Sequence, residues 1–215
     1  MKILITGAAG FIGYHTVKKI LYKNSNLKVV GIDSMNNYYS SKLKADRIKD
    51  LKKRFKKKFI FEKVNICNKK KIIKLFKKNN FHTVINLAAQ AGVRYSLTNP
   101  EAYFDTNLKG FFNILEVSKT FKVKHLISAS TSSVYGANKA SRFNAKMPVG
   151  HPIQFYAATK RSNEIIGHAY SHIYKLPITF LRFFTVYGPW GRPDMALFLF
   201  VKNISANKPI NVFNF

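Results

Sequence analysis

Short apolar runs alternate with amphipathic stretches along most of the chain. The runs are rich in Val, Ile and Phe without a clean polar alternation, which is typical of strands that are covered on both faces. They comprise Lys2–Thr6, Lys28–Asp33, Lys58–Asn65, Thr83–Ala89, His125–Thr131 and Pro177–Phe184. Helical periodicity lies between them, at about 11–24, 40–57, 69–79, 99–119 and 155–174. This order predicts an α/β fold, a doubly wound parallel sheet with helices on both faces.

Turn-forming residues gather in two segments, 136–152 and 187–194, which are rich in Gly, Pro and Asn. They follow the fifth and sixth predicted strands. The carboxyl edge of a doubly wound sheet is where ligands bind, so we expect both loops beside the functional site. A chain of 215 residues is long enough for one well-buried domain with a small appendage.

The chain is strongly basic, with a formal net charge of +28, and the charge is uneven. Residues 42–82 hold 17 of the 37 Lys and Arg residues and three acids. Such a segment can bind nucleic acid. Apolar residues recur through it at helical spacing, however, which favours two solvated helices with outward lysines and makes nucleic-acid binding the weaker hypothesis. The apolar positions are Leu43, Ile48, Leu51, Phe55, Ile72, Ile73, Leu75 and Phe76.

Cysteine content and hydropathy indicate the compartment. Cys67 is the single cysteine, which excludes an internal disulfide and fits a reducing environment. The apolar run Met195–Val201 is far shorter than a membrane-spanning helix. Residues 2–6 lead directly into a glycine turn and are interpreted as a strand, not a signal peptide. We therefore predict a cytoplasmic protein without membrane contact, and we predict no metal site.

A glycine-rich turn, Thr6-Gly-Ala-Ala-Gly-Phe-Ile-Gly13, joins the first strand to the first helix. Gly7 permits the tight turn, Gly10 allows a pyrophosphate to approach the backbone, and Gly13 allows close packing of helix on strand. The free N–H groups of the helix, including those near Phe11 and Ile12, would bind the anion. Asp33 ends the second strand, where a carboxylate binds ribose hydroxyls and repels a 2′-phosphate. The turn predicts binding of NAD.

Tyr156 and Lys160 form a second motif, Tyr-Ala-Ala-Thr-Lys. Four residues are about one helical turn, so both side chains reach one spot. A tyrosine hydroxyl with a pKa near ~10 is a poor base, and a neighbouring ammonium group would lower that pKa. Such a pair also occurs on ordinary helix surfaces, so the motif gains meaning only beside the glycine turn.

The GxxGxxG spacing with a downstream YxxxK resembles the extended short-chain dehydrogenase/reductase family over essentially the whole chain. The resemblance implies a Rossmann fold and a catalytic Ser/Thr at Thr131, whose hydroxyl would share the moving proton with Tyr156. It also implies further cofactor contacts at Asn65, Ile66, Leu87, Ala88, Ala89, Gln90 and Asn107. Asn65 departs from the family, which usually has an acid there to accept from the adenine amine; an Asn oxygen can also accept.

Neighbouring positions distinguish reactions within that family. Its sugar dehydratases carry an Asp-Glu pair where this chain has Ser132 and Ser133, and its decarboxylases carry Glu at the second of these positions. Because this chain has neither acid, we expect epimerisation, which needs only the removal and return of a hydride.

Two longer segments, Gln90–Ser96 and Thr185–Met195, resemble UDP-glucuronate 4-epimerases. This implies 4-epimerisation of UDP-glucuronate to UDP-galacturonate, feeding surface polysaccharide synthesis. A uronate needs a carboxylate clamp, for which Arg192, Thr185 and the serines at 132 and 133 offer a cation and hydroxyls. Arg94 is a second candidate for the anionic substrate, and either arginine can instead form a structural ion pair.

Related enzymes continue beyond the position of Phe215 with a segment that completes the sugar-nucleotide lobe. We expect residues 1–186 to form the NAD-binding Rossmann domain and residues 187–215 to begin an incomplete C-terminal substrate lobe. The alternatives are another nucleotide-sugar epimerase or decarboxylase, or a catalytically incomplete NAD-binding fragment. The resemblance also implies a homodimer packed through the helices near 99–119 and 155–174.

Overall fold

One parallel sheet organises the molecule, as seen in a computed structural model that describes residues 1–24 and 26–212. Within these residues its strand order is β3-β2-β1-β4-β5-β6, and every neighbouring pair is parallel. The strands are β1 (Lys2–Thr6), β2 (Lys28–Asp33), β3 (Phe59–Lys63), β4 (Thr83–Asn86), β5 (His125–Thr131) and β6 (Ile178–Phe183). The order reverses between β1 and β4, so the prediction of a doubly wound α/β fold is confirmed.

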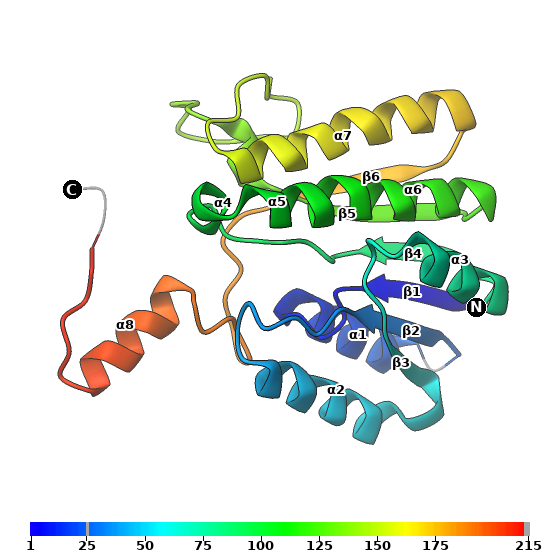
Figure 1. Cartoon of the computed structure of the whole chain (residues 1–215), viewed down its shortest axis with the longest axis horizontal. Helices are drawn as coiled ribbons and strands as arrows, with labels where there is room; N and C mark the ends of the chain where they lie inside the picture. Colours follow the sequence, from blue (N-terminus) through cyan, green and yellow to red (C-terminus); the bar gives the residue numbers. More distant parts are fainter. Residues whose placement is uncertain (25, 213–215) are drawn as a thin grey trace.

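The helices lie on the two faces of this sheet (Figure 1). They are α1 (Phe11–Lys23), α2 (Ser41–Phe55), α3 (Lys69–Lys78), α4 (Tyr95–Thr98), α5 (Pro100–Tyr103), α6 (Phe111–Thr120), α7 (Phe155–Tyr174) and α8 (Ala196–Ser205). Two 3-10 turns, Lys56–Lys58 and Ser132–Tyr135, complete the set. The single helix predicted over 99–119 is interrupted: α5 and α6 flank a π-helical segment, Phe104–Gly110.

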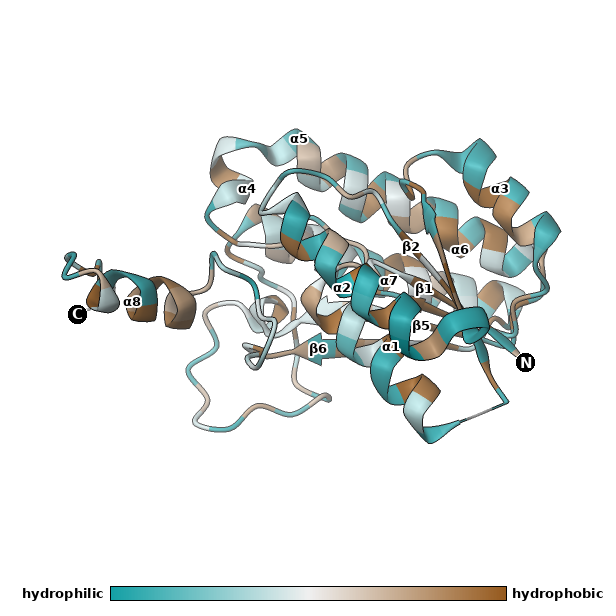
Figure 2. Ribbon diagram, turned by 90° about the horizontal axis from the view of Figure 1, so that it is seen from below, coloured by the Kyte–Doolittle hydropathy of each residue, from teal (hydrophilic) through white to brown (hydrophobic). Residues whose placement is uncertain are grey.

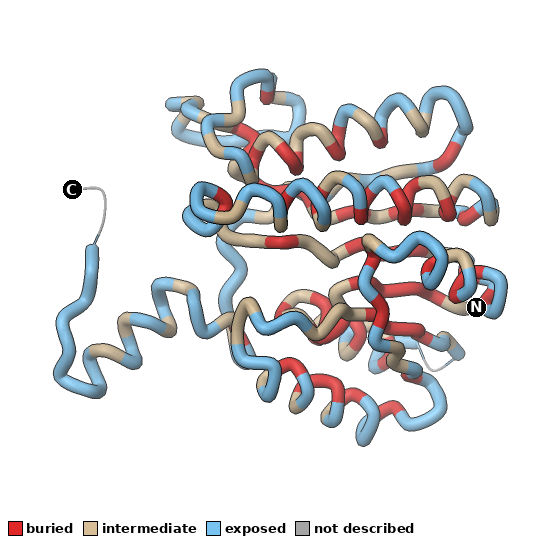
Figure 3. The backbone as a smooth tube through the Cα atoms, in the orientation of Figure 1, coloured by how far each residue is buried: buried red, intermediate tan, exposed pale blue. Residues whose placement is uncertain are grey.

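Successive strand residues supply two separate cores. Ile3 and Ile5 pack with α1 and α2, whereas Leu4 between them packs with α3 and α6 on the other face. The residues of both cores are fully or almost fully buried, and Figure 3 shows β1 and the inner faces of the helices in red. Apolar side chains on both faces explain why the strands lack polar alternation.

The lysine-rich helices are amphipathic, as their apolar spacing predicts. Ile48 and Leu51 are buried on α2, and Ile72 is buried on α3. The expectation that the cations occupy outward faces is wrong at two positions, because Lys44 is 5% exposed and Arg47 is 0% exposed. Both find oxygen acceptors inside the protein, which compensates for lost hydration.

Gly7 and Gly13 bring α1 against the end of β1. Gly7 adopts a φ of +68°, and a Cβ added at Gly13 would lie 2.1 Å from the Gly7 carbonyl oxygen. The predicted roles of these two glycines are therefore visible in the backbone.

Buried polar groups cross the carboxyl edge of the sheet. Thr6 Oγ1 donates to Asn86 Oδ1 at 2.7 Å, and Asn86 Nδ2 donates to Ser128 Oγ at 3.3 Å. Thr6 Oγ1 also accepts from the N–H of Ala88 at 3.0 Å, which fixes the start of the loop after β4. These bonds join three adjacent strands where the predicted ligand site begins.

The C-terminal part lies apart from the two cores. Helix α8 extends away from the sheet and has no buried residue (Figures 1 and 2). Its apolar side chains include Leu197, Val201 and Ile204, which are 54%, 58% and 62% exposed. Among the described residues, no helix combines the length and the apolar character needed to cross a membrane.

Gly13→Ala tests the close approach of α1 to β1. The new methyl group would overlap the Gly7 carbonyl, and backbone cannot move aside as a side chain does. We expect the free energy of unfolding to fall by at least about 2 kcal/mol, despite the better helix propensity of Ala. Urea unfolding measures the change. Gly150→Ala is the control, because no atom lies within 4 Å of its added Cβ; equal stabilities of the two variants would contradict the expectation.

Candidate functional site

A cavity of about 1260 Å³ opens at the carboxyl edge of the sheet, between its two halves. That volume exceeds the ~300–1,000 Å³ usual for a single small ligand. The cavity is lined by nearly all the site residues predicted from sequence: Gly7, Gly10, Phe11, Ile12, Gly13, Asp33, Asn65, Ile66, Leu87, Ala88, Ala89, Gln90, Arg94, Thr131, Ser132, Ser133, Tyr156, Lys160, Thr185 and Arg192. Asn107 alone of the predicted set lies behind its wall.

The glycine turn and Asp33 form one end of the cavity. The carboxylate of Asp33 accepts from the N–H of Ala9 at 3.1 Å and from the N–H of Met35 at 2.8 Å. Gly10 caps α1 without any side-chain hydrogen bond, so the first N–H groups of the helix remain available. A fixed carboxylate beside a free helix N-terminus suits a ribose next to a phosphate.

The adenine side carries Asn65 and Ile66. Asn65 is exposed, and its Oδ1 already accepts from the N–H of Cys67 at 2.9 Å. Ile66 is buried, and its carbonyl oxygen accepts from Asn113 Nδ2 at 2.9 Å. An amide oxygen can accept twice, so the predicted adenine contact at Asn65 stays a prediction.

Asn107 connects the loop after β4 to helix α7 from the middle of the π-helical segment. Its Oδ1 accepts from the Gln90 N–H at 2.8 Å, and its Nδ2 donates to the Gln90 carbonyl at 3.1 Å. The same Nδ2 donates to Thr159 Oγ1 at 3.1 Å, and this hydroxyl donates to the Tyr156 carbonyl at 2.8 Å. Asn107 therefore supports this loop and α7 from behind the cavity wall, while the cofactor contact predicted for it stays a prediction. π-Helical turns are frequent at functional sites.

Thr131 and Tyr156 both line the cavity, close enough for the Thr131 hydroxyl to influence the phenol. Burial raises the pKa of Tyr156 above its ordinary value, while the Thr131 hydroxyl and the charge of Arg192 oppose this rise. The expected lowering of this pKa by Lys160 is not found: Lys160 is not among the groups that influence the phenol. In the protein alone, desolvation outweighs the nearby positive charge.

Lys160 lies one turn further along α7 and is only 2% exposed. Burial lowers its pKa from the ordinary 10.5 to about 8, and the negative charge of Glu164 acts in the opposite direction. None of the hydrogen bonds found in residues 1–24 and 26–212 uses its ammonium group, so its N–H groups are available to a ligand. A buried, unpaired ammonium group facing a cavity is typical of a binding or catalytic lysine.

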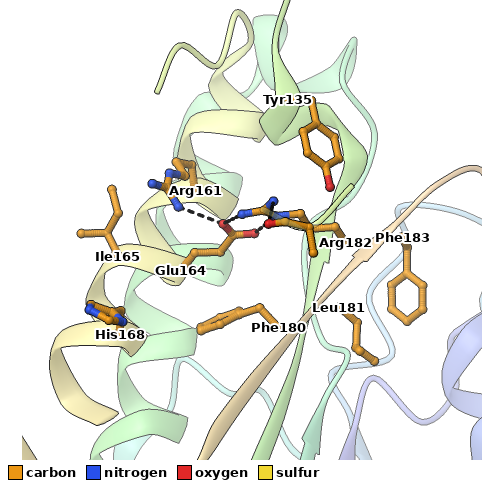
Figure 4. Close-up of a pocket in the computed structure, with 10 residues that line it drawn as sticks. Tyr135, Arg161, Glu164, Ile165, His168, Phe180, Leu181, Arg182 and Phe183 are labelled. Carbon is orange, nitrogen blue, oxygen red and sulfur yellow. Dashed lines mark hydrogen bonds and ion pairs between the residues drawn. The ribbon is translucent and has the colours of Figure 1, made fainter. Parts of the chain in front are cut away.

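Glu164 holds the outer side of this helix in place (Figure 4). Its carboxylate accepts from Ser130 Oγ at 2.6 Å, from Arg161 at 3.0 Å and from both Nε and Nη2 of Arg182, at 3.0 and 2.9 Å. These partners come from β5, α7 and β6. A second cavity, of about 800 Å³, borders the cluster, but every nitrogen of Arg182 already has an acceptor. The cluster is therefore structural: it fixes Ser130 next to Thr131, and α7 below Lys160.

The residues predicted to bind substrate also line the main cavity. Ser133 contacts Thr131: its N–H donates to Thr131 Oγ1 at 3.2 Å. Arg192 reaches the cavity, but its guanidinium group forms a two-pronged ion pair with Asp194. Thr185 is exposed on the wall. Arg192 thus forms the ion pair that is the alternative prediction from sequence, and a role for these groups in binding substrate stays a prediction.

Several lining residues were missed by the sequence prediction. Lys44 donates to the Asn36 carbonyl at 2.7 Å and to Asn36 Oδ1 at 2.6 Å, and its ammonium group lies 4.4 Å from the centre of the Tyr39 ring. Tyr38 stacks under Arg192, with 5.7 Å between the ring centre and the guanidinium carbon. The sequence did contain a signal for these lining residues: a pair of tyrosines at 38–39 lies after Asp33 and just before a basic helix.

These observations fit a bound dinucleotide. The glycine turn leaves the first N–H groups of α1 free and lines the cavity, Asp33 is fixed by two N–H groups, and Lys160 has free donors. At the far end, Gln90 Nε2 is buried beside the Tyr103 hydroxyl without a hydrogen bond of normal geometry. A buried amide without a partner favours a ligand that supplies one.

Comparison with known proteins agrees with this geometry. Residues 3–214 match the NAD dependent epimerase/dehydratase family. The protein CapI of Staphylococcus aureus is 54% identical over 214 residues, which are 100% of this chain and 63% of that protein. A probable UDP-glucuronate 4-epimerase of Rhizobium meliloti is 46% identical, over 99% of this chain and 61% of that protein.

A solved structure is also similar. The UDP-glucuronic acid 4-epimerase of Bacillus cereus, crystallised with UDP-glucuronic acid and NAD, superposes with a TM-score of 0.89 at 38% identity. The match covers 99% of this chain and 66% of that one. The chain thus spans a little over three fifths of the length of the curated relatives it matches.

The lowered pKa of Lys160 has a consequence for stability that Lys160→Met tests. Between pH 8 and about 10.5 the unfolded lysine stays protonated while the folded one loses its proton, so wild-type stability rises with pH. We expect the unfolding free energy of the wild type to gain up to ~1.4 kcal/mol per pH unit over the variant in this window. At pH 7 the variant should be the more stable protein, because it buries no charge. Urea unfolding across the pH range measures both; Lys53→Met, at an exposed position, is the control, and parallel curves for Lys160→Met and wild type would contradict the shift.

Proposed function

We propose that this chain, which belongs to the NAD dependent epimerase/dehydratase family, carries the catalytic half of a UDP-glucuronate 4-epimerase. The reaction would interconvert UDP-glucuronate and UDP-galacturonate through a 4-keto sugar. The names of the relatives above support this substrate. The product would supply activated galacturonate to a glycosyl-transfer step in surface polysaccharide synthesis.

The choice of reaction rests on one observation, the positions of the carboxylates in the cavity. Among its described lining residues the only acids are Asp33, at the ribose end, and Asp194, which is paired with Arg192. Around Tyr156 the lining groups are the hydroxyls of Thr131, Ser132 and Ser133. Removal of a proton beside a ketone needs a base, and none of these groups is a carboxylate. Transfer of a hydride to the cofactor and back needs no base other than the tyrosine.

Cofactor binding would use the glycine turn and Asp33. The free N–H groups at the start of α1 would bind the pyrophosphate, and the carboxylate of Asp33 would accept from the ribose hydroxyls. A 2′-phosphate would be repelled by that carboxylate, which favours NAD over NADP. Bound NAD would supply the hydride acceptor, the returning hydride and a positive charge that favours the phenolate.

Proton transfer would belong to Tyr156. Its phenolate would take the proton from the sugar 4-hydroxyl and later return it to the same oxygen, when the hydride is returned to the opposite face of C4. Thr131, whose hydroxyl favours the charged form of the phenol, would stabilise the charge that develops. Lys160 would donate hydrogen bonds that orient both the phenolate and the ligand. Because burial raises the pKa of Tyr156 in the protein alone, the base would form only with this assistance.

The carboxylate of the sugar would need its own partners. The candidates are the hydroxyls of Ser132, Ser133 and Thr185 and the guanidinium group of Arg192, which would have to exchange Asp194 for the sugar carboxylate; Arg94 lies on the same cavity. A 4-keto uronate is a β-keto acid that can lose CO2. Holding its carboxylate out of alignment with the ketone would protect the intermediate, so we assign the clamp a protective role as well as a binding role.

A second candidate is a cofactor-binding unit that does not turn over by itself. The chain spans 63% of its relatives, and helix α8 buries none of its residues in the described structure. We propose that residues 1–186 form the NAD-binding domain and that residues 187–215 begin the lobe that binds the sugar nucleotide. Its completion would require the sequence that the longer relatives have.

We also propose a homodimer formed by α6 and α7, which lie side by side (Figure 1). Phe112, Ile165 and Ile173 on these helices are 41%, 56% and 63% exposed. Large apolar side chains gathered on an exposed face are typical of a protein–protein contact. Sedimentation velocity should show a dimer for the wild type and a monomer for Ile165→Lys. Identical sedimentation of the two proteins would exclude this interface.

Tyr156→Phe tests the reaction itself. The variant keeps the ring and loses the proton acceptor, so we expect at least about a 10²-fold loss of UDP-galacturonate formation with NAD affinity unchanged. Chromatography of sugar nucleotides after incubation with UDP-glucuronate and NAD measures it, with Tyr174→Phe as a control at an exposed tyrosine outside the cavity.

Three other outcomes would redirect the assignment. Release of a UDP-pentose by the wild type would indicate a decarboxylase. An inactive wild type that binds NAD but not UDP would support the cofactor-binding unit. Unchanged conversion by Tyr156→Phe would exclude the mechanism.

A further inference from the structure

The segment after β6 crosses from one half of the molecule to the other. Residues 185–194, here named the strap, leave the carboxyl end of β6 and pass to the side of α1 and α2 (Figure 1). Thr185, Val186, Arg192 and Asp194 line the same cavity as the glycine turn. The strap is therefore one wall of the site that the proposed function assigns to the dinucleotide.

Two contacts attach the strap to α1. His15 Nε2 lies 2.8 Å from the Pro189 carbonyl oxygen, and the Tyr14 ring stacks on Trp190 with 5.5 Å between ring centres. These contacts join residues about 175 positions apart in the sequence. The strap is thus fixed to the cofactor half of the protein, although it begins at the other half.

Arg47 of α2 makes the central attachment. Its Nη1 donates to the Ala9 carbonyl at 2.9 Å and to the Tyr39 hydroxyl at 2.7 Å. Its Nη2 donates to the Trp190 carbonyl at 2.5 Å and to the Gly191 carbonyl at 3.2 Å. One planar guanidinium group thereby joins the glycine turn, the loop before α2 and the strap. Lysine cannot reproduce this fork.

The charge of Arg47 is buried without an acid. The side chain is 0% exposed, and none of the ion pairs in the described part of the chain includes it. Its Nε has no hydrogen-bond partner at all. A buried cation held only by carbonyl and phenol oxygens is costly unless an anion comes near. The turn that it holds, through Ala9, is the one expected to bind a pyrophosphate.

We propose that Arg47 is a positioning residue that fastens the strap to the glycine turn and so retains the bound dinucleotide. The inference rests on the proposed function. The pyrophosphate supplies the negative charge that Arg47 lacks, and the Arg47 bonds to Trp190 and Gly191 hold the cavity wall closed. Retention matters for an epimerase, because the reduced cofactor must stay until it returns its hydride.

NADH release measures this role. Protein loaded with NADH is mixed with excess NAD, and the fluorescence decay gives the dissociation rate. Arg47→Met removes the charge and all four bonds, and we expect release about tenfold faster or more. Arg47→Lys keeps the charge without the fork and should fall between Arg47→Met and wild type. Lys53→Met, an exposed cation on the same helix, is the matched control and should release NADH at the wild-type rate.

Hydrogen exchange reports the strap directly and needs no variant. In the wild type, NAD should slow amide exchange within residues 187–195. In Arg47→Met this segment should exchange faster before NAD is added and gain little protection afterwards, while β1 and β4 keep wild-type protection. Loss of protection throughout the sheet in that variant would mean that Arg47 serves folding instead, and this would overturn the inference.

The outcomes separate the two proposals. A wild-type chain that binds neither NAD nor NADH contradicts the proposed function, and the inference falls with it. A wild type that binds NAD, with unchanged release in both Arg47 variants, overturns the inference alone. Absence of NAD-dependent protection at 187–195 in the wild type overturns it as well.

Discussion

Every strand of the described sheet runs in the same direction, and the arrangement of the site depends on that constraint. Parallel strands deliver their carboxyl ends to a single edge, so segments distant in the chain meet there. The glycine turn follows β1, Asp33 ends β2, and Thr131 ends β5. The reversal of strand order between β1 and β4 opens a space at this edge, and the main cavity occupies it. The topology of the sheet is therefore sufficient to bring these polar residues together.

Sequence pattern predicts this framework well because each strand and helix leaves a local signal. Apolar runs place β1, β2 and β5 to the residue, and the periodicity of 155–174 matches α7. The interrupted helix around Asn107 is different. A π-helical segment has the composition of an ordinary helix, and only its contacts with Gln90 and Thr159 show why the backbone widens there. The pattern also places Lys44 and Arg47 on a solvated helix, since periodicity treats every cation as outward. The Trp190 carbonyl that accepts from Arg47 lies 143 positions away in the sequence, so local periodicity cannot predict this contact.

The pKa values of Tyr156 and Lys160 depend more on burial than on the distance between charged groups in the sequence. The Tyr156–Lys160 spacing suggests a cation that lowers the pKa of a phenol, whereas desolvation raises the pKa of the phenol and lowers that of the amine. Both groups are therefore held nearer to neutral than in water. Glu164 opposes the effect of burial on the pKa of Lys160, because its negative charge favours the protonated amine. Arg161 and Arg182 bind the same carboxylate from the outer side. A charged ligand bound beside these two groups would change the pKa of both.

The polar bridge across the carboxyl edge bears on how the sheet is assembled. Thr6 pairs with Asn86, and Asn86 with Ser128, at matched positions of β1, β4 and β5. A slip of one residue in either pairing would turn these side chains toward an apolar core and leave their hydrogen-bond groups unsatisfied. Apolar contacts alone would tolerate such a slip, since both faces of these strands are hydrophobic. The three polar side chains therefore select the correct strand alignment, and the cavity at the carboxyl edge forms only when the sheet has been assembled in that register.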